Sequence, residues 1–599
     1  MRSEPLFFTD HPVHTHRVYM YREALGESGL PWGYDPAVGA GTVMPPSQDV
    51  GAKIHQLTGA LLAFLPPGEI VRLLLFAAVL LAPLGTLLAC RRLGFSVGQQ
   101  ACVMAALLGV IWAALPSYFS LGLVSFAAAS LLTPYVLVLF LAFVSEPGYK
   151  RYAACVAALA LLLLLHVLGP FVIAPSLVLL TLAKPGLGAR WRLALVCVPI
   201  LIALLNGFWL APFVLAETNP QIAPAPIAEM ELDGHLTASD WSDSLATPSL
   251  DRIVRRAVGV TLGVYGLVVL YRTVSLWAFL TLVTAMGFAV ALRFFGSFFP
   301  VIVTMQPLRF IAPAVVLLTI PAGLALESLG RRFRLRSEFS AALGGFVLVG
   351  AALFLGRPTP LPLPPSPDPL RAFLAARTTT EDRLLVQSDD GYRRSGYEAK
   401  AFPIAYDHEV IGNTFPETHD PAQFHSDFLW GRPLASWRPD DLRSTLERWG
   451  VTWVFVQTDD ARQLIEAATG DPGESVGPYQ AFQVPSASPS RFLVGRGRLT
   501  AKVNRIELTD LEPQDGLIVL RYRYHPAWRT DSGETVLRYP VPEDQTGFLA
   551  LEAPSRDVTL HFDPASIFGA TWPEPIRAVE LVSRDAEPAS DTGNHNRRK

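Results

Sequence analysis

The sequence predicts a polytopic α-helical membrane domain followed by an outer region of α/β and β-sandwich structure. Of the 599 residues, 51% are hydrophobic and only 17% are charged, against about a quarter in soluble domains. Long apolar segments recur between residues 68 and 355, and the composition then changes abruptly to TPLPLPPSPDP. Short alternating patterns typical of strands follow this stretch. The chain is therefore expected to have a membrane part and a separate polar part.

About ten segments are candidates for membrane spans, because a spanning helix needs roughly 20 mostly apolar residues. They lie near residues 68–90, 98–115, 119–144, 152–168, 170–183, 193–215, 257–271, 274–292, 307–328 and 338–355. The stretch 54–67 is too short to span, and its apolar stripe predicts an interfacial helix on the outer leaflet.

Lys and Arg are enriched in cytoplasmic loops and so indicate the orientation of the spans. One set of alternate loops holds twelve of them: Arg91, Arg92, Lys150, Arg151, Lys184, Arg190, Arg192, Arg272, Arg331, Arg332, Arg334 and Arg336. The opposite set holds chiefly Arg252, Arg255, Arg256 and Arg293. We therefore expect residues 1–67, 216–256 and everything after 356 to lie outside the cytoplasm. An additional helix before Met1 would then be needed to carry the first segment across.

The outer region is expected to begin after a proline-rich linker, residues 357–369. In residues 370–490, DDLRSTLERWG predicts a short helix ended by Gly450, and VTWVFVQ (451–457) predicts a buried strand, as in a small α/β layer. Residues 491–584 alternate in GLIVLRYRYHPAW, ETVLRYPV and DVTLHF, which predicts an antiparallel sandwich. Residues 585–599 are expected to be a disordered tail.

Composition and motifs exclude several classes of function. A formal net charge of -3 gives no basic footprint for nucleic acid. The four cysteines lie in apolar segments without CxxC spacing, so no disulfide framework is expected. No P-loop, GxSxG or HExxH motif is present, which disfavours cytosolic nucleotide chemistry.

Asp10, in TDHPVHTHR (9–17), is the best candidate for a catalytic residue. A carboxylate in the first outer segment is suited to act as a general base or a metal ligand for a substrate that enters from the membrane surface. The structural alternative is a carboxylate that caps a helix beginning near Val13. His11 and His14 lie close by, so a zinc site with Asp10 is one reading. A hard divalent ion held by Asp10 is another.

Further polar residues are expected on the same outer face. His14 and Arg17 share one face if this segment is helical. Asp35, in WGYDPAVGAG, belongs either to a binding loop or to a plain turn. Lys53 is suited to meet a phosphate, and the alternative is that it snorkels to lipid headgroups.

The ends of two later spans add to this face. His166 ends a run of leucines, and it either lines a site or is a hydrogen-bonded core residue. Gln306 and Arg309 flank Pro307 at the outer start of a span, where a helix N-terminus and a guanidinium favour phosphate. Snorkelling of Arg309 is the alternative.

The motifs FTDHPVHTHRVYMYREAL, WGYDPAVGAG and VGAKIHQL, with the leucine-flanked His166 and QPLRF, resemble a bacterial family. It is the family of multi-pass proteins named for a 6-pyruvoyl-tetrahydropterin-synthase-related domain, within the GT-C class of membrane glycosyltransferases. The C-terminal half, with VTWVFV and HPAWR, is similar to YfhO-like membrane proteins.

This resemblance implies sugar transfer from a polyprenyl-phosphate donor to a glycan, lipid or protein acceptor, on the outer face of a bacterial inner (cytoplasmic) membrane. Asp10 would be the base or the ligand of a divalent metal, Mg or Mn. The chain departs from the family pattern in having His11 where many members carry a second acidic residue, and His11 is the candidate for a second ligand. The remaining candidates would bind the donor phosphate or the substrate: His14, Arg17, Asp35, Lys53, His166, Gln306 and Arg309.

Two other functions fit the same pattern. A transporter or flippase of lipid-linked saccharides would also place polar groups in an apolar bundle, although we find no internal repeat and no charges deep in consecutive spans. A non-enzymatic envelope assembly protein is the third reading.

Overall fold

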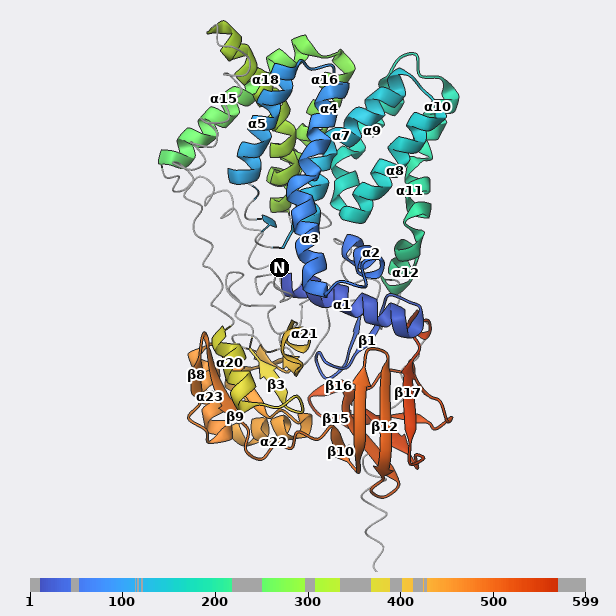
Figure 1. Cartoon of the computed structure of the whole chain (residues 1–599), viewed down its shortest axis with the longest axis vertical. Coiled ribbons are helices and arrows are strands. Elements are labelled where there is room, and N and C mark those ends of the chain that lie inside the picture. The colour runs from blue at the N-terminus through green and yellow to red at the C-terminus, as the bar shows by residue number, and fades with distance from the viewer. Residues whose placement is uncertain are drawn as a thin grey trace, which may run out of the picture.

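Figure 1 shows a helical bundle at one end of the molecule and a β-rich region at the other, with further helices between them. The computed structural model describes residues 11–44, 53–113, 115, 118–119, 122–217, 250–296, 307–333, 368–387, 401–412, 424 and 428–568. Several predicted features lie wholly or largely outside these ranges: Asp10, the loop at 216–256, Gln306, the span at 338–355, the linker at 357–369 and the tail at 585–599.

The N-terminal segment and the bundle consist of helices. They are α1 (His11–Ser28), α2 (Lys53–Leu61), α3 (Pro67–Leu80), α4 (Ala82–Arg92), α5 (Val97–Ala113), α7 (Val124–Ser145), α8 (Tyr149–Leu165), α9 (Leu168–Ala183), α10 (Ala189–Val196), α11 (Val198–Leu205), α12 (Gly207–Glu217), α15 (Leu250–Thr273), α16 (Leu276–Phe295), η2 (Pro307–Phe310) and α18 (Ile311–Arg332). Among the described residues, four helical stretches are long and apolar enough to cross a membrane: Pro67–Arg92, Val124–Ser145, Leu276–Phe295 and Ile311–Arg332. The length and composition of these helices agree with the prediction of a multi-pass membrane protein. The number of ten spans stays a prediction.

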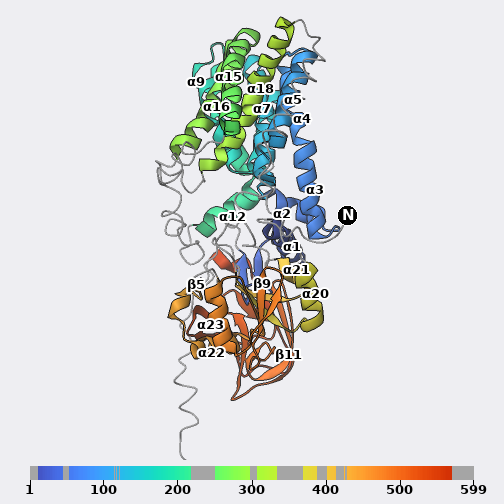
Figure 2. The same cartoon turned by 90° about the vertical axis from the view of Figure 1, so that its left-hand side faces the viewer.

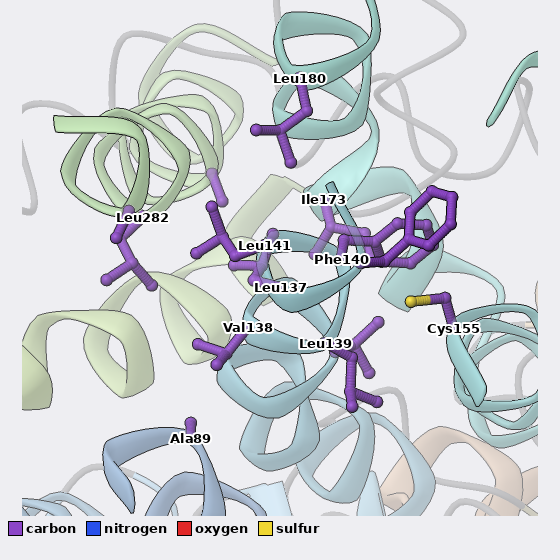
Figure 3. Packing of buried hydrophobic residues seen from close by; sticks show 14 of the residues in the cluster. Ala89, Leu137, Val138, Leu139, Phe140, Leu141, Cys155, Ile173, Leu180 and Leu282 are labelled. Atoms are coloured by element: carbon purple, nitrogen blue, oxygen red, sulfur yellow. The ribbon is translucent and has the colours of Figure 1, made fainter. Parts of the chain in front are cut away.

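Helix α7 forms the centre of the bundle. In its apolar window 83% of the residues are buried, against 33% for the window of α16. Leu137, Phe140 and Leu141 of α7 pack with Ile173 of α9 and Leu282 of α16 (Figure 3). Because almost every face of α7 meets another helix, its sequence is apolar all round rather than along one stripe.

The predicted span at 193–215 is wrong in its shape. The structure divides it into α10, α11 and α12, and α11 and α12 are bent by 90° at Asn206. Asn206 is buried, and its side-chain amide donates to the carbonyls of Ala160 and Ile202 while its oxygen accepts from Trp209 Nε1. A polar side chain that satisfies freed backbone groups makes such a break tolerable at membrane depth.

The basic loops gather at one end of the bundle. The turns after α4, α7, α9 and α15 and the end of α18 lie at the top in Figure 1, whereas α1 and the β-rich units lie at the bottom. Arg91, Lys150, Lys184, Arg272 and Arg331 belong to this top end. Assigning that end to the cytoplasm remains a prediction from the charge bias.

The first β-rich unit is an α/β layer. Its elements are α20 (Asp368–Arg377), β3 (Arg383–Val386), α21 (Phe402–Tyr406), β4 (Glu409–Gly412), the small hairpin β5 (Phe428–Leu429) and β6 (Arg432–Pro433), η4 (Leu434–Ser436), α22 (Pro439–Trp449), β7 (Trp453–Val456), α23 (Asp459–Thr469), β8 (Glu474–Val476) and β9 (Tyr479–Gln483). The main sheet has the order β4-β3-β7-β9-β8, in which β3 pairs in parallel with β4 and β7. The predicted helix before Gly450 and the buried strand after it are confirmed as α22 and β7, and Gly450 ends α22 with φ 64°.

The second unit is an antiparallel sandwich, as predicted. Its strands are β10 (Phe492–Val494), β11 (Arg496–Lys502), β12 (Arg505–Glu512), β13 (Leu517–Arg523), β14 (Trp528–Thr530), β15 (Val536–Val541), β16 (Asp544–Glu552) and β17 (Val558–Phe562), followed by η5 (Ser566–Phe568). They form two four-stranded sheets in the orders β10-β13-β16-β15 and β11-β12-β17-β14.

The N-terminal segment also belongs to this outer structure. A hairpin of β1 (Gly33–Asp35) and β2 (Thr42–Met44) follows α1. Trp32 and Tyr34 pack into the core of the sandwich with Trp528 and Phe562. Figure 2 shows α1 and α2 between the bundle and the β-rich units.

Candidate functional site

The segment that holds most of the predicted site residues is a helix rather than an open loop. Helix α1 begins at His11, the first described residue, and its first two turns are buried. His11 Nε2 donates to the carbonyl of Phe119, and His14 Nε2 donates to the carbonyl of Gly122, both at 2.9 Å. Positions three apart share a helix face, so α1 seats this face on the connection between α5 and α7.

Helices α1 and α2 pack against each other and carry four buried basic residues, which we call the basic cluster: His14, Arg17, Lys53 and His55. The rings of His14 and His55 stack with their centroids 4.3 Å apart. All four residues are buried, and Lys53 is fully buried. The Lys53 ammonium lies 5.6 Å from the centre of the Trp209 ring on α12, in a cation–π arrangement.

Burial decides the protonation state of the histidines on α1. Burial lowers the pKa of His14 well below 6.5, and His55, Arg17 and His11 lower it further. Burial also lowers the pKa of His11. Both imidazoles are therefore neutral at pH 7, because protonating either would add a charge to a dry, already basic environment.

A second group of candidates lies at the end of α8 and on η2. His166 caps α8; its Nδ1 accepts from the backbone N–H of Leu168 at 3.2 Å, and its ring meets the edge of Phe126. Arg309, on η2, interacts electrostatically with His166. Helices far apart in sequence thus bring these two predicted residues together.

Asp35 is not brought to the basic cluster. It accepts from His16 Nε2 at 2.6 Å and from the backbone N–H of Ala37 at 3.0 Å, and only 1% of its side chain is exposed. His16 points from α1 toward the hairpin, whereas His14 points toward the bundle. Asp35 therefore ties α1 to β1, in agreement with the turn reading of its sequence.

Three residues that the sequence did not single out also lie here. The His55 ring stacks on His14, the Trp209 ring lies beside the Lys53 ammonium, and the Tyr118 hydroxyl donates to the carbonyl of Arg309. His55 could have been noticed, because it lies two residues after Lys53 in a largely apolar segment. The other two depend on contacts across the fold that no local pattern indicates.

The expected metal can be tested in part against the donor groups. A metal-ligating histidine typically donates its other N–H to a carbonyl or carboxylate, and the Nε2 bonds of His11 and His14 have that form, with both Nδ1 atoms buried and lacking a hydrogen-bond partner. Imidazole nitrogens suit zinc better than Mg²⁺, which prefers oxygen. Within the described ranges no group of three His, Cys, Asp or Glu residues is placed to hold an ion. The described groups alone therefore do not fit a Mg²⁺ site, and a metal stays a prediction that rests on Asp10.

Comparisons with known proteins give weak matches only. No family model matches the sequence, and no curated protein matches it, so the resemblance inferred from the motifs stays a prediction. Among solved structures, the mycobacterial arabinofuranosyltransferase AftD aligns at 15% identity over 82% of this chain and 40% of its own, with a TM-score of 0.48. The oligosaccharyltransferase of Archaeoglobus fulgidus, solved with zinc and sulfate, aligns at 14% identity over 78% of this chain and 67% of its own, with a TM-score of 0.46.

These similarities set no activity for this chain. Both identities lie below 25% and both TM-scores below 0.5. The chain also spans well under half the length of the arabinofuranosyltransferase.

Proposed function

We propose that this protein is a membrane glycosyltransferase that moves a sugar from a polyprenyl-phosphate donor to a cell-envelope acceptor on the extracytoplasmic face. The observation that carries the proposal is the basic cluster, which lies where an apolar bundle meets a polar outer region. A lipid-linked phosphate needs both environments at once, because its tail stays in the bilayer while its charge must be bound at the edge.

The charge of the cluster suits the leaving group of such a reaction. The Lys53 ammonium is a compact point charge, and Arg17 adds a planar guanidinium, which is the geometry that binds phosphate oxygens in pairs. In a site from which water is excluded, fixed positive groups stabilise developing negative charge far more than they do in water. Arg309 adds a further guanidinium beside His166 at the same end of the bundle.

The reaction that we propose is a single displacement. Asp10 accepts the proton of the acceptor hydroxyl, and the hydroxyl oxygen forms a bond to the anomeric carbon. The bond from that carbon to the phosphate oxygen breaks, and its electron pair leaves with the lipid phosphate toward Lys53 and Arg17. One displacement inverts the anomeric centre, so a product with retained configuration would contradict this mechanism.

A transfer assay tests the proposal. Membranes that contain the protein are incubated with a panel of radiolabelled polyprenyl-phosphate sugars, and label in the acceptor fraction is counted. We expect Asp10→Asn to lower transfer by about 10²–10⁴-fold, the usual contribution of a general base. Glu23→Gln, a partly exposed carboxylate later in α1, is the matched control and should leave transfer unchanged. Transfer that survives Asp10→Asn would contradict the assigned role of Asp10.

One observation favours a second candidate, a transporter of lipid-linked saccharides. The bent pair α11–α12 is a discontinuous helix, and transporters often build substrate sites at such breaks. A flippase would move a fluorescent polyprenyl-phosphate sugar across proteoliposomes without cleaving it. Intact lipid on the far leaflet, with no released polyprenyl phosphate, would favour this reading over the enzyme.

A further inference from the structure

The sandwich holds the N-terminal hairpin through one buried asparagine. Asn504 occupies the turn between β11 and β12 with φ 61° and is 1% exposed. Its Oδ1 accepts from the backbone N–H of Tyr34 at 2.7 Å, and its own N–H donates to the Tyr34 carbonyl at 3.0 Å. Its Nδ2 donates to Ser28 Oγ at 3.3 Å. Asn504 thus forms hydrogen bonds both with the backbone at the start of the hairpin and with Ser28 at the end of α1.

The fit at this point is close. A Cβ placed on Gly33 would overlap the side-chain amide of Asn504, so the two positions are complementary in shape. Next to them, Trp32 Nε1 donates to the carbonyl of Pro564 at 3.2 Å, and the Tyr34 hydroxyl donates to the carbonyl of Arg523 at 2.8 Å. Buried polar groups that are all paired fix one geometry, because each alternative leaves a donor or acceptor unsatisfied.

The loop between the two strands of the hairpin also joins the α/β layer. The backbone N–H of Val410 donates to Ala37 at 2.8 Å, and that of Gly39 donates to Val410 at 2.7 Å, which adds residues 37–39 to the edge strand β4. The N–H of Arg523 donates to Ala40 at 2.7 Å. Both outer units therefore hold the segment that follows α1.

Helix α1 lies between these outer contacts and the bundle. Toward the sandwich, Met20 and Ala24 pack against Val503, the residue before Asn504. Toward the bundle, Val18 packs against Ile70 and Val71 of α3. Through His16, the helix is also bound to Asp35 of the hairpin. A displacement of the hairpin would therefore be transmitted to the helix that carries the basic cluster.

From these contacts we infer that Asn504 is a positioning residue, through which the C-terminal sandwich holds α1 against the bundle. The outer region is on this account part of the machinery that shapes the membrane-edge site, and its contribution is not limited to binding a partner. The contacts stand independently of the reaction at the site, whereas their consequence for catalysis rests on the proposed glycosyltransferase function.

A labelling experiment in the full-length protein tests this inference. Val18→Cys replaces a fully buried residue at the seat of α1 on α3, in a background with Cys197→Ala, because the other three cysteines are buried. The rate at which a membrane-impermeant maleimide modifies this thiol reports how often α1 leaves its seat. Asn504→Ala removes two side-chain hydrogen bonds, so we expect labelling to become about tenfold faster or more.

Two further variants keep the test falsifiable. Asn504→Asp retains the acceptor for Tyr34 N–H and should restore slow labelling. Asp557→Ala removes a hydrogen bond to the backbone of Asp510 at another turn of the sandwich and should leave labelling slow. Equal labelling rates in Asn504→Ala and the parent would overturn the inference, as would equally fast labelling in Asp557→Ala, which would indicate general loosening.

The same variants separate the inference from the proposed function. If Asn504→Ala speeds labelling and also lowers transfer or raises the apparent KM for the donor, the result supports both the inference and the proposed function. If it speeds labelling while the parent protein transfers no label from any donor, α1 is positioned by Asn504 but the site is not a glycosyltransferase.

Discussion

The molecule buries two groups of charged side chains, and they are compensated in different ways. In the outer region, Glu409 accepts from Arg383 at 2.5 Å, pairs with Arg491 at 3.0 Å and accepts from the Tyr522 hydroxyl at 2.5 Å. We call these four residues the junction cluster, because they lie between the α/β layer and the sandwich. Burial alone would raise the pKa of Glu409, but Arg383 and Arg491 lower it to about 2.

The basic cluster beside α1 has the opposite character. Its described members are all basic, and the pKa of His14 is lowered by burial and by its positive neighbours. In the junction cluster each charged group lies next to a group of opposite charge, which is typical of a network that stabilises the fold. The basic cluster instead places the ammonium of Lys53 and the guanidinium of Arg17 at the edge of the apolar bundle, and both groups are suited to bind phosphate oxygens. This contrast is the reason to seek function at α1 rather than at the junction.

The largest effect on folding is expected at the junction cluster. Glu409→Gln leaves two buried guanidinium groups without their carboxylate, and breaking a buried pair in this way destabilises a protein by about 3–5 kcal/mol. The rate of limited proteolysis of the outer region should therefore rise steeply. Glu552→Gln, on the surface of β16, is the control and should change little. If Glu409→Gln resists proteolysis as well as the parent protein does, the junction cluster does not stabilise the outer region.

A smaller effect is expected where the hairpin meets the sandwich. Gly33→Ala places a methyl group against the Asn504 amide, and overpacking of this kind destabilises by about 1–3 kcal/mol. Asn504→Gly keeps the positive φ and removes the obstructing side chain. In the double variant we expect the loss caused by Gly33→Ala to be smaller than in the single variant, as measured by thermal unfolding. Additive losses would show that the two residues do not interact.

The two clusters should also respond to acid in different pH ranges. The folded-state pKa values of His11 and His14 lie below 6.5, so the unfolded chain binds protons first and stability falls as the pH drops below 6.5. The pKa of Glu409 falls from 4.5 to about 2 on folding, so its contribution is complete above 4.5 and is lost between 4.5 and 2. Melting curves recorded from pH 7.5 to pH 3 check these assignments. His14→Gln should reduce only the loss of stability that begins below pH 6.5, and Glu409→Gln should reduce only the loss that begins below pH 4.5. A variant that changes the other decline would contradict these assignments.

The sequence predicted much of the architecture, because much of it follows from local patterns. Apolar length predicted α7 and α18, and alternation predicted the strands around Leu517–Arg523 and Val558–Phe562. The sequence also singled out His14, Arg17 and Lys53, since an ionisable residue in an apolar setting is informative by itself, and the structure finds all three buried on α1 and α2.

The remaining features depend on contacts between distant segments. The break at Asn206 requires the carbonyl of Ala160 on a neighbouring helix, and the hairpin requires Asn504, which lies 470 residues from Tyr34 in the chain. The first outer segment was expected to be a region of its own, yet its Trp32 lies in the core of the C-terminal sandwich. A single sequence holds no signal for such pairings, because each partner is an ordinary residue in its own neighbourhood.

The measurement that tests the account most directly is the binding of undecaprenyl phosphate to the full-length protein in nanodiscs. Lys53→Met removes the fully buried ammonium of the basic cluster, whereas Lys150→Met removes an exposed one at the opposite end of the bundle. A charge-assisted hydrogen bond contributes about 1.5–3 kcal/mol, so Lys53→Met should weaken binding by roughly tenfold to a hundredfold. Lys53→Arg should retain most of the affinity, and Lys150→Met should retain all of it. Equal affinity in Lys53→Met, Lys150→Met and the parent would contradict the claim that the basic cluster binds the donor phosphate.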